Sequence, residues 1–201
     1  GIFTHFHSAD TDDSATTTQW ERFQRVLREL PRRPAVIHAA NSAAALRGTR
    51  YSGDLVRPGI FLYGGAAGGR EPKVVIHLRA PVVSVRKIRA GDSVSYGATW
   101  TAPAATEIAT LGIGYADGVP RVLGGRTDVE LAGARRALVG RVTMDLTMVA
   151  VPVGTVQCDD VATIYGGLVS LDEQAARAGT ISYELLTALG GRVPRLYRHK
   201  S

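Results

Sequence analysis

Two tyrosines that stand beside glycines are the side chains of this sequence best suited to move a proton. Tyr115 lies within Gly112-Ile-Gly-Tyr-Ala-Asp-Gly-Val-Pro-Arg121, directly after the apolar run 108–113, and Tyr96 lies nineteen positions earlier, beside Gly97. Strand ends that lead into Gly/Pro turns commonly display working side chains. The two phenols could therefore share one pocket, although two amphipathic tyrosines that cap a β-core would give the same pattern.

A second group of candidate residues follows three short apolar segments near the N-terminus. In chain order these residues are His5, then His38, Asn41 and Ser42, and then Arg57, Gly59 and Ile60. In a parallel barrel such side chains converge at the C-terminal face, where active sites lie. Asn41 and Ser42 at a helix start offer N–H groups and a hydroxyl to a phosphate, and Gly59 lets a backbone N–H come close. Asn and Ser are also ordinary helix caps, so the combination, rather than any one residue, favours a phosphate site.

The remaining polar candidates have no decisive pattern. His5 and His7 could contribute to a zinc site, but such a site needs a third ligand, and no Cys or Glu-x-x-His companion accompanies them. We therefore expect no metal. Asp145 suits either a pocket lining or an ordinary turn. Arg121 and Arg141 suit either ion pairs or solvated positions, and their spacing does not decide between the two.

The composition of the 201-residue chain is typical of a soluble globular protein with one large domain or two small ones. Hydrophobic residues make up 45% of the sequence and charged residues 21%. No apolar run approaches the roughly 18 residues of a membrane span, and the first residues lack a signal-peptide pattern. The single cysteine, Cys158, excludes an internal disulfide and fits a reducing compartment. We therefore expect a cytoplasmic protein without a membrane partner.

The net charge of +6 does not by itself indicate a nucleic-acid partner. The lysines are few, namely Lys73, Lys87 and Lys200, and the arginines are scattered along the chain. No basic run alternates with the aromatic residues that would stack on bases. We therefore expect no binding of nucleic acid.

The elements that would position these side chains alternate between strand and helix in the N-terminal third. Strands are predicted at 1–6, 35–39 and 55–63, and helices after Thr18 and at 43–46. Thr18 and Glu21 form a capping box for the longer helix. The apolar face of that helix consists of Trp20, Phe23, Leu27 and Leu30, and Pro31 ends it. This alternation favours parallel βα units, of which three are too few to close a barrel. Because the chain opens inside a strand, we expect further sequence upstream.

The pattern changes after the glycine-rich segment 64–69 to short strands separated by turns. Strands are predicted at 74–76, 82–88, 108–113, 129–131, 137–142, 148–153 and 161–164. A capping box at Ser170 and Glu173 opens a helix, and a last helix spans 180–189 before a Gly-Gly pair. The sequence therefore predicts an α/β part over 1–72 and a mainly β domain over 73–201.

Seven motifs, in order along the chain, resemble those of one enzyme family. They are Thr4-His-Phe with Ala9-Asp10, His38-Ala-Ala-Asn-Ser42, Arg57-Pro-Gly-Ile with Tyr63-Gly64, Ser95-Tyr-Gly-Ala-Thr99, Gly114-Tyr-Ala-Asp-Gly-Val-Pro-Arg121, Gly140-Arg-Val-Thr-Met-Asp145, and Ile181-Ser-Tyr-Glu with Arg192-Val-Pro-Arg195. The family is that of the alanine racemases, fold-type III enzymes that use pyridoxal 5'-phosphate (PLP). The resemblance implies the C-terminal part of a PLP-binding (β/α)8 barrel followed by an antiparallel β domain. It also implies interconversion of L-alanine and D-alanine for peptidoglycan precursors.

The resemblance implies a role for each candidate residue. Tyr96 would be one catalytic base, acting across a homodimer interface on the cofactor of the other subunit. Arg57 would face the pyridine nitrogen of PLP, and His5 would link Arg57 to the tyrosine. The cofactor-binding residues would further include Ser42, Gly59, Ile60, Tyr183, His38 and Asn41. The substrate-binding residues would be Met144, Asp145 and Tyr115, and Tyr115 would also line the substrate entryway with Asp10, Arg121 and Arg141.

Elementary chemistry agrees with the two central roles. An arginine stays protonated, so it donates to the pyridine nitrogen without protonating it, which weakens PLP as an electron sink. A tyrosine with a pKa of about 10 is a poor base at neutral pH. We therefore expect the cationic Arg57, acting through His5, to favour Tyr96 as a base.

One part of the family pattern is missing from this sequence. The family's other base is a lysine that bonds to PLP in an Ala-Asn-Ala-Tyr-Gly context, and no lysine here has such surroundings. The family's arginine that binds the substrate carboxylate from the first half of the barrel is also absent. By itself the chain is therefore expected to be inactive in two-base racemisation. Two alternatives stay open: a racemase of the same family with another specificity, such as serine or lysine, and a non-catalytic truncated fragment.

Overall fold

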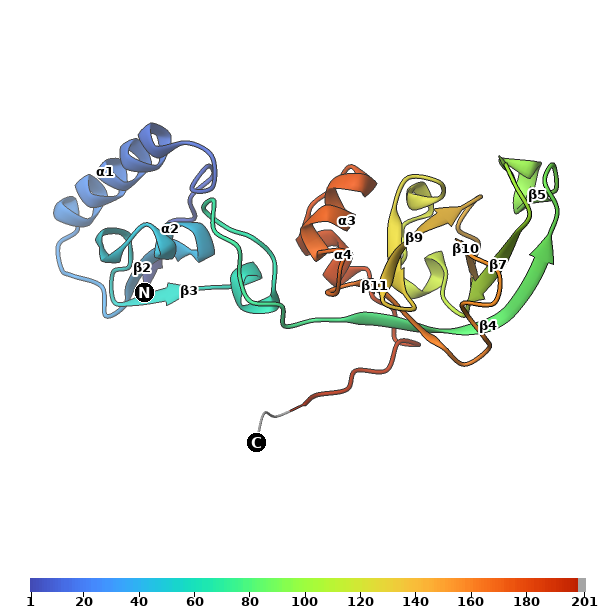
Figure 1. The fold of residues 1–201 in the computed structure, drawn as a ribbon. Coiled ribbons are helices and arrows are strands. Elements are labelled where there is room, and N and C mark those ends of the chain that lie inside the picture. The colour runs from blue at the N-terminus through green and yellow to red at the C-terminus, as the bar shows by residue number, and fades with distance from the viewer. Residues whose placement is uncertain (199–201) are drawn as a thin grey trace. The chain divides into compact units, whose positions relative to one another are not determined.

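Residues 1–198 are described by a computed structural model, in which the chain forms two units, Gly1–Val75 and Ile76–Ser201 (Figure 1). The first unit combines helices with a small parallel sheet, and the second is built around a closed antiparallel barrel. Each unit therefore has its own architecture. None of the helices within residues 1–198 combines the length and the apolar character needed to cross a membrane.

The first unit contains the parallel βα units that the sequence predicts. Its strands pair in the order β1-β2-β3, and both pairings are parallel. The strands are β1 (Ile2–Phe3), β2 (Ile37–Asn41) and β3 (Leu55–Arg57), and the helices are α1 (Asp13–Glu29), α2 (Ser42–Leu46) and the 3-10 turns η1 (Thr49–Tyr51) and η2 (Ile60–Tyr63). Because the strands are parallel, their carboxyl ends lie on the same side of the sheet; Asn41 and Arg57 are the last residues of β2 and β3, and His5 follows β1.

The helix α1 begins earlier than predicted. Its N-cap is Asp12, whose carboxylate accepts the Ala15 N–H at 2.8 Å, so Thr18 lies in the helix interior and the predicted start there is wrong. A carboxylate at the N-cap satisfies an otherwise unpaired N–H and also suits the positive end of the helix dipole. The predicted apolar face is present, with Phe23 buried. The helix ends at Glu29, since the residue before Pro31 adopts the extended conformation.

Two further N-terminal predictions have different outcomes. Asn41 caps α2 as predicted, since its side-chain oxygen accepts the Ala44 N–H at 3.0 Å. The predicted strand over 55–63 is too long, because β3 ends at Arg57 and a 3-10 turn follows. Pro58 has no N–H to continue the ladder, and this break carries Gly59 and Ile60 away from the sheet.

The second unit is a closed barrel of six antiparallel strands in the order β10-β7-β4-β11-β8-β9. The strands are β4 (Leu78–Ile88), β7 (Thr106–Leu111), β8 (Asp128–Leu131), β9 (Ala134–Val139), β10 (Thr147–Val151) and β11 (Val161–Tyr165). A hairpin of β5 (Ser93–Val94) and β6 (Trp100–Thr101), with the 3-10 turn η3 (Tyr96–Ala98) at its tip, stands between β4 and β7. The predicted strand at 74–76 is absent: Val74 and Val75 are exposed, and no strand among the described residues pairs with them.

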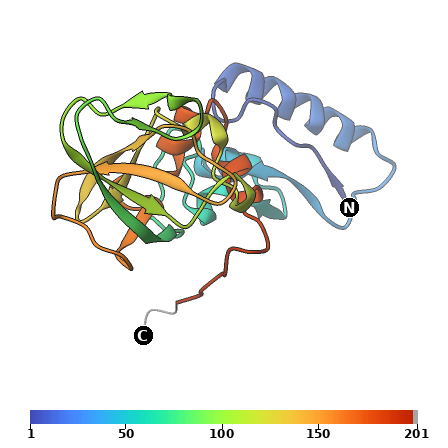
Figure 2. The same cartoon turned by 90° about the vertical axis from the view of Figure 1, so that its right-hand side faces the viewer.

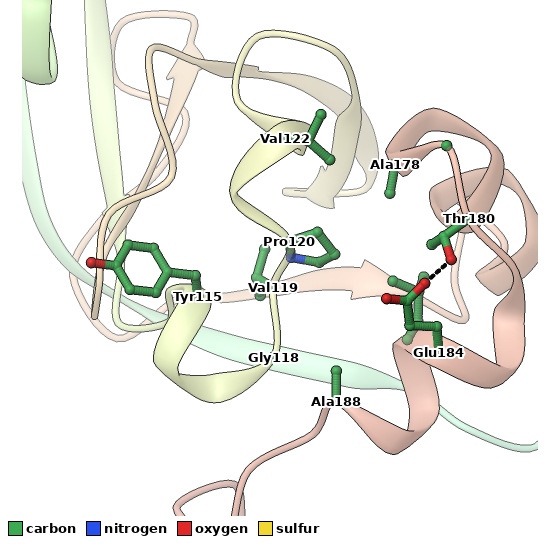
Figure 3. Close-up of a pocket in the computed structure, with 11 residues that line it drawn as sticks. Tyr115, Gly118, Val119, Pro120, Val122, Ala178, Thr180, Glu184 and Ala188 are labelled. Atoms are coloured by element: carbon green, nitrogen blue, oxygen red, sulfur yellow. Dashed lines mark hydrogen bonds between the residues drawn. The ribbon is translucent and has the colours of Figure 1, made fainter.

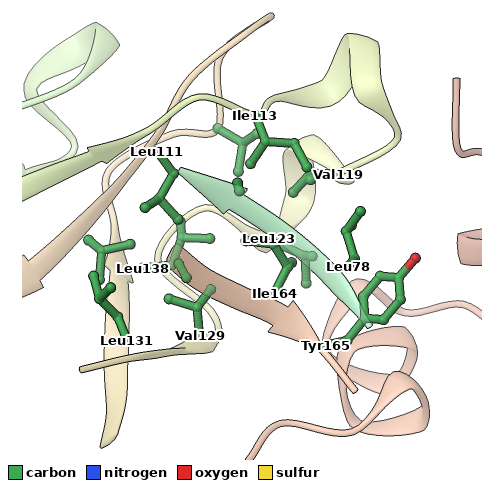
Figure 4. Packing of buried hydrophobic residues seen from close by; sticks show 14 of the residues in the cluster. Leu78, Leu111, Ile113, Val119, Leu123, Val129, Leu131, Leu138, Ile164 and Tyr165 are labelled. Carbon is green, nitrogen blue, oxygen red and sulfur yellow. The ribbon is translucent and has the colours of Figure 1, made fainter. Parts of the chain in front are cut away.

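The barrel closes around a single hydrophobic core (Figure 4). Along β4 the buried residues alternate with exposed ones, so Leu78, Ala80 and Val82 point inward. This alternation follows from the two-residue period of a strand. Together with Leu111 and Ile164 they form part of the cluster, and closure leaves no unpaired strand edge in the barrel.

Two helices pack beside the barrel, α3 (Leu171–Ala178) and α4 (Ser182–Thr187). Ser170 caps α3 as predicted, since its hydroxyl oxygen accepts the Glu173 N–H at 3.0 Å. The fully buried Gln174 ties α3 to the barrel: its Nε2 donates to the Asp128 and Ile164 carbonyls at 2.9 and 2.7 Å. The helix α4 is shorter than the predicted 180–189. Residues 194–198 then extend away from the barrel (Figures 1 and 2).

Candidate functional site

The guanidinium of Arg57 is the centre of the candidate site in the first unit. Its Nη1 lies 2.5 Å from Nδ1 of His38. Its Nη2 donates to the carbonyls of Thr4 at 3.2 Å and Ala39 at 3.1 Å. The partners follow β1 or lie within β2, and Arg57 itself ends β3, so all three parallel strands fix the position of one permanent positive charge.

His5 belongs to the same cluster. Its Nδ1 lies 3.3 Å from Nη2 of Arg57. Because a guanidinium can only donate hydrogen bonds, Nδ1 accepts in both His5 and His38, and a neutral ring then carries its proton on Nε2. The Phe3 ring stacks on His38 at 5.1 Å between centroids and lies 5.2 Å from Cζ of Arg57. The Phe3 ring therefore contacts the guanidinium of Arg57, in addition to the hydrogen bonds that hold this side chain.

A second corner of the site joins the start of α2 to the turn after β3. Ser42 is buried, and its Oγ accepts the N–H groups of Gly59 at 2.8 Å and Phe61 at 3.4 Å. The N–H of Ile60, between them, has no acceptor within residues 1–198. A Cβ at Gly59 would meet nothing within 4 Å, so the turn faces open space. Hydroxyl and backbone N–H donors around open space are the groups that bind a phosphate.

Asp10 lies in the first unit but outside this corner. Its carboxylate accepts the N–H of Gly68 at 2.9 Å. The preceding residue, Ala9, is buried, and its carbonyl accepts Nε of Arg47 at 2.8 Å. Asp10 is therefore held by the glycine-rich segment rather than by the Arg57 cluster.

Tyr96 belongs to the second unit and is strongly exposed, at 73% of its maximal area. It begins the 3-10 turn η3 at the tip of the β5–β6 hairpin. The turn lines a pocket together with Thr143, and the other residues of this pocket are Ser95 and Gly97. The phenol is therefore accessible to a substrate or to another polypeptide.

The loop that carries Met144 and Asp145 lies against the turn of Tyr115. The N–H of Tyr115 donates to the Thr143 carbonyl at 2.9 Å, and the N–H of Ala116 donates to the Met144 carbonyl at 3.0 Å. A Cβ at Gly114 would lie 2.3 Å from the Met144 carbonyl oxygen, so only glycine permits this approach. Two of the sequence motifs are thus joined through their backbones.

Arg192 ties the same two loops together through its side chain. Its Nη2 lies 2.9 Å from an Asp117 carboxylate oxygen and 2.8 Å from an Asp145 carboxylate oxygen. The Asp145 hydrogen bond is the main cause that raises the pKa of Arg192, and the charge of Asp117 adds to it. Sequence reasoning gave Arg192 no role, because its partners lie 47 and 75 positions away and no local pattern indicates such distant pairs.

Tyr115 lines a different pocket from Tyr96. This pocket lies between the turn of Tyr115 and the helices α3 and α4, and Figure 3 shows the Tyr115 ring pointing away from Thr180 and Glu184. The sequence suggested that Tyr96 and Tyr115 share a pocket, but each of them lines a different one of these two pockets. Neither tyrosine is buried.

The remaining predicted residues are exposed at the surface of the second unit. Met144, Asp145 and Tyr183 are exposed, and so are Arg121 in the 3-10 turn η5 (Arg121–Leu123) and Arg141. Within residues 1–198 no group of three or more His, Cys, Asp and Glu side chains could hold a metal ion.

Comparison with known protein families gives one result for both units. The family model described as "Alanine racemase, N-terminal domain" matches residues 1–67, and the model described as "Alanine racemase, C-terminal domain" matches residues 75–197. The curated alanine racemase of Desulforamulus reducens is 41% identical over 209 residues, which cover 98% of this chain and 56% of that protein. The alanine racemase of Hahella chejuensis is 37% identical, with coverage of 100% and 56%.

Solved structures agree with these relatives. The biosynthetic alanine racemase of Pseudomonas aeruginosa is 37% identical with a TM-score of 0.88, covering 98% of this chain and 56% of that one. The alanine racemase of Streptomyces lavendulae is 34% identical with a TM-score of 0.91, covering 100% and 56%. The Bartonella henselae enzyme, with covalently bound pyridoxal phosphate, is 34% identical with a TM-score of 0.90, covering 98% and 56%.

These comparisons confirm the predicted fold class, part of an α/β barrel followed by an antiparallel β domain. The chain spans about half the length of the curated relatives it matches. The family models together match nearly all of its residues, and the seven sequence motifs lie within the matched ranges. The chain belongs to the alanine racemase family.

Proposed function

We propose that this chain supplies part of the active site of a PLP-dependent alanine racemase, which interconverts L-alanine and D-alanine for peptidoglycan precursors in the cytoplasm. The observation that carries the proposal is the Arg57 cluster, in which two imidazoles and two carbonyls from or beside the parallel sheet hold one guanidinium. Membership of the family supports the reaction. Residues 1–72 would belong to the PLP-binding barrel, and residues 73–201 would form the β domain.

The groups around Ser42 fit the phosphate of PLP. The Ser42 hydroxyl, which accepts two N–H groups, keeps its own hydrogen for donation. The N–H of Ile60 also has no acceptor among the described residues. Hydrogen-bond donors that lack an acceptor at the start of a helix favour the binding of a dianion such as a phosphate. Ser42, Gly59 and Ile60 would thus bind the phosphate, and Asn41 and His38 would support them; the resemblance to the family adds Tyr183 to the cofactor-binding residues.

Arg57 fits the ring nitrogen of PLP. Its acceptors occupy Nη2 and one hydrogen of Nη1, so Nε and the other Nη1 hydrogen remain without an acceptor within residues 1–198. A guanidinium donates to a pyridine nitrogen but does not give up its proton. When bound, PLP withdraws electrons from the substrate α-carbon and so acidifies the α-hydrogen. Arg57 would moderate that withdrawal and thereby disfavour side reactions.

Tyr96 would be one of the two bases, and it would act across a homodimer interface. Its exposure of 73% is compatible with an approach to another subunit. The N–H of Met144 has no acceptor among the described residues and would bind the substrate carboxylate. Tyr115, Asp10, Arg121 and Arg141 would line the entryway.

The second base would be a lysine that is not in this sequence. The relatives extend well beyond the matched region, so a further segment of polypeptide would supply the lysine. To test the proposal, the segment of the Streptomyces lavendulae racemase that precedes its matched region would be fused upstream of this chain. We expect the joined protein to bind PLP, measured by visible absorbance, and to racemise alanine. A folded, PLP-loaded joined protein that leaves both alanine enantiomers unchanged would contradict the proposal.

Tyr96→Phe in the joined protein tests the assigned base. General acid–base catalysis contributes about 10²–10⁴-fold, so we expect racemisation to fall by that factor while PLP absorbance stays unchanged. Tyr197→Phe, which alters another exposed tyrosine, is the matched control and should keep the parent rate. Racemisation of both enantiomers by Tyr96→Phe at close to the parent rate would refute the role of Tyr96.

A further inference from the structure

Ser95, directly before Tyr96, has a backbone conformation that serine rarely adopts. Its φ is 70° and its ψ is 174°. This region of the Ramachandran map is occupied almost only by glycine, because a Cβ clashes with the backbone there. Such a residue persists when its surroundings hold it in place, and residues of this kind concentrate at functional sites.

Two hydrogen bonds between the Ser95 hydroxyl and the Arg141 backbone hold Ser95 in this conformation. The Ser95 hydroxyl donates to the Arg141 carbonyl at 3.0 Å, and its Oγ accepts the Arg141 N–H at 3.1 Å. The next turn is closed locally by the Ala98 N–H, which donates to the Ser95 carbonyl at 3.1 Å. The side chain of Ser95 does not cap this turn. An ordinary capping role is thus excluded, and the hydroxyl reaches a loop 46 positions away.

Gly140 makes this contact possible. Its φ is 66°, and a Cβ at this position would lie 2.5 Å from the Cβ of Ser95. Any larger residue would therefore push the two segments apart. The contact is also extended by Arg141, whose Nη2 is 3.5 Å from the place where a Cβ on Gly97 would stand. The turn of Tyr96 thus packs against Gly140 and Arg141.

That loop carries the groups expected to meet the substrate. Thr143 lines the pocket of Tyr96, and Met144 follows directly. The loop is itself fixed, because Thr143 donates from Oγ1 to the Leu146 carbonyl at 2.9 Å. The contact between Ser95 and Arg141 therefore sets where the phenol lies relative to the Met144 backbone. A proton transfer depends on this distance, since reacting atoms must be held in a narrow geometry.

We propose that Ser95 is a positioning residue for Tyr96. The strained conformation of Ser95 is maintained by its hydrogen bonds to the Arg141 backbone. It fixes the position of the Tyr96 phenol relative to the loop that would bind the substrate carboxylate. Glycine would tolerate the conformation but would leave the turn free to adopt others, and alanine would keep the strain without the hydrogen bonds. The inference rests on the proposed function, since it takes Tyr96 as a base.

The first experiment uses the 201-residue chain and does not depend on activity. Amide hydrogen exchange, measured by NMR, is compared for the parent, Ser95→Ala, Ser95→Gly and the control Ser93→Ala, an exposed serine on β5. We expect the Arg141 amide to exchange at least tenfold faster in both Ser95 variants and at the parent rate in the control. Should Ser95→Ala fail to fold, Ser95→Gly still gives the answer, because glycine adopts this conformation without strain.

The second experiment uses the joined protein loaded with PLP. In both Ser95 variants we expect kcat to fall about tenfold and the α-deuterium isotope effect to rise for one enantiomer of alanine, the one deprotonated by Tyr96. A merely structural defect would lower the active fraction without changing either isotope effect. In Ser93→Ala, kcat and both isotope effects should match the parent.

The two experiments separate the possible failures. An Arg141 amide that exchanges at the parent rate in both Ser95 variants would overturn the proposal, whatever the activity shows. Faster exchange with unchanged isotope effects would overturn it as well, because the contact would then be structural only. A parent joined protein that binds PLP without racemising alanine would instead refute the proposed function, and the exchange result would still stand.

Discussion

At the scale of single residues, the second unit shows how strictly close contacts select a side chain. Gly114 lies so close to the Met144 carbonyl that no Cβ fits, and Gly140 makes room for Ser95 in the same way. Tyr165, by contrast, lacks a contact that its side chain would favour, because its hydroxyl is buried without a hydrogen-bond partner within residues 1–198. Figure 4 shows this tyrosine at the edge of the core cluster.

Tyr165 gives a testable dependence of stability on pH. Burial raises the pKa of its phenol to about 12, against about 10 in the unfolded chain. Between pH 10 and about 12 the unfolded state loses this proton while the folded state keeps it, so stability falls as pH rises, by about 1.4 kcal/mol per pH unit. Tyr165→Phe should reduce that slope and leave stability at pH 7 equal to or about 1 kcal/mol above the parent value. Urea unfolding at pH 7 to 12 measures both.

A matched variant controls for general alkaline damage. Tyr197→Phe removes an exposed phenol, so its slope should equal that of the parent. An alkaline slope that Tyr165→Phe leaves unaltered would show that the Tyr165 phenol does not carry the effect.

At the scale of elements, caps and buried polar contacts fix where helices begin and how they attach. Gln174 is fully buried, and its side chain bonds two strands and accepts the Thr127 hydroxyl at 2.9 Å. Because all its polar atoms are paired, it attaches α3 at one place on the barrel. At the other end of the chain, the start of α1 depends on one carboxylate, that of Asp12.

The start of α1 can be tested with two substitutions six residues apart. Asp12→Ala should lower the free energy of unfolding by about 0.5–2 kcal/mol, because it leaves the Ala15 N–H without its acceptor. Thr18→Ala should change stability little or raise it slightly, since alanine favours a helix interior. Thermal unfolding followed by circular dichroism measures both. A larger loss for Thr18→Ala would restore the sequence-based cap and contradict the observed one.

At the scale of the whole molecule, the two units differ in how completely their sheets are closed. The barrel strands each pair on both sides. The three-stranded sheet instead has two edge strands, β1 and β3, and carries exposed Phe3, Leu55 and Val56. An open, apolar sheet edge is a surface that ordinarily pairs with more polypeptide. This difference supports the proposal that further barrel elements come from outside this sequence.

Limited proteolysis tests the division into units. Lys73 and Lys87 are both exposed, but Lys73 lies outside any helix or strand while Lys87 pairs with Glu107 in the β4–β7 ladder. Trypsin should therefore cleave after Lys73 at least tenfold faster than after Lys87, because cleavage needs a locally unfolded backbone. Mass spectrometry of the fragments over time measures both rates. Equal rates at the two lysines would contradict the placement of Lys73 outside regular structure and of Lys87 within the barrel ladder.

Local patterns predicted much of the fold. Strand–helix alternation gave the parallel sheet, Asn41 and Ser170 gave two caps, and six of the seven strands predicted after residue 73 exist with shifted ends. Two errors had different causes. At the start of α1 two capping candidates lie within a few residues, and Asp12 rather than Thr18 makes the cap. The predicted strand at 74–76 has no pairing strand among the described residues, and short sequence windows do not contain that information.

The residue types of the candidate site were also readable from the sequence, but their arrangement was not. The sequence by itself determined the family motifs, the βα pattern and the absence of a lysine in the family context. Only the tertiary structure joined Arg192 to Asp117 and Asp145, and Ser95 to Arg141. The physical reason is that helix and strand periodicity act over a few residues, whereas these contacts form between segments that come together only when the barrel closes.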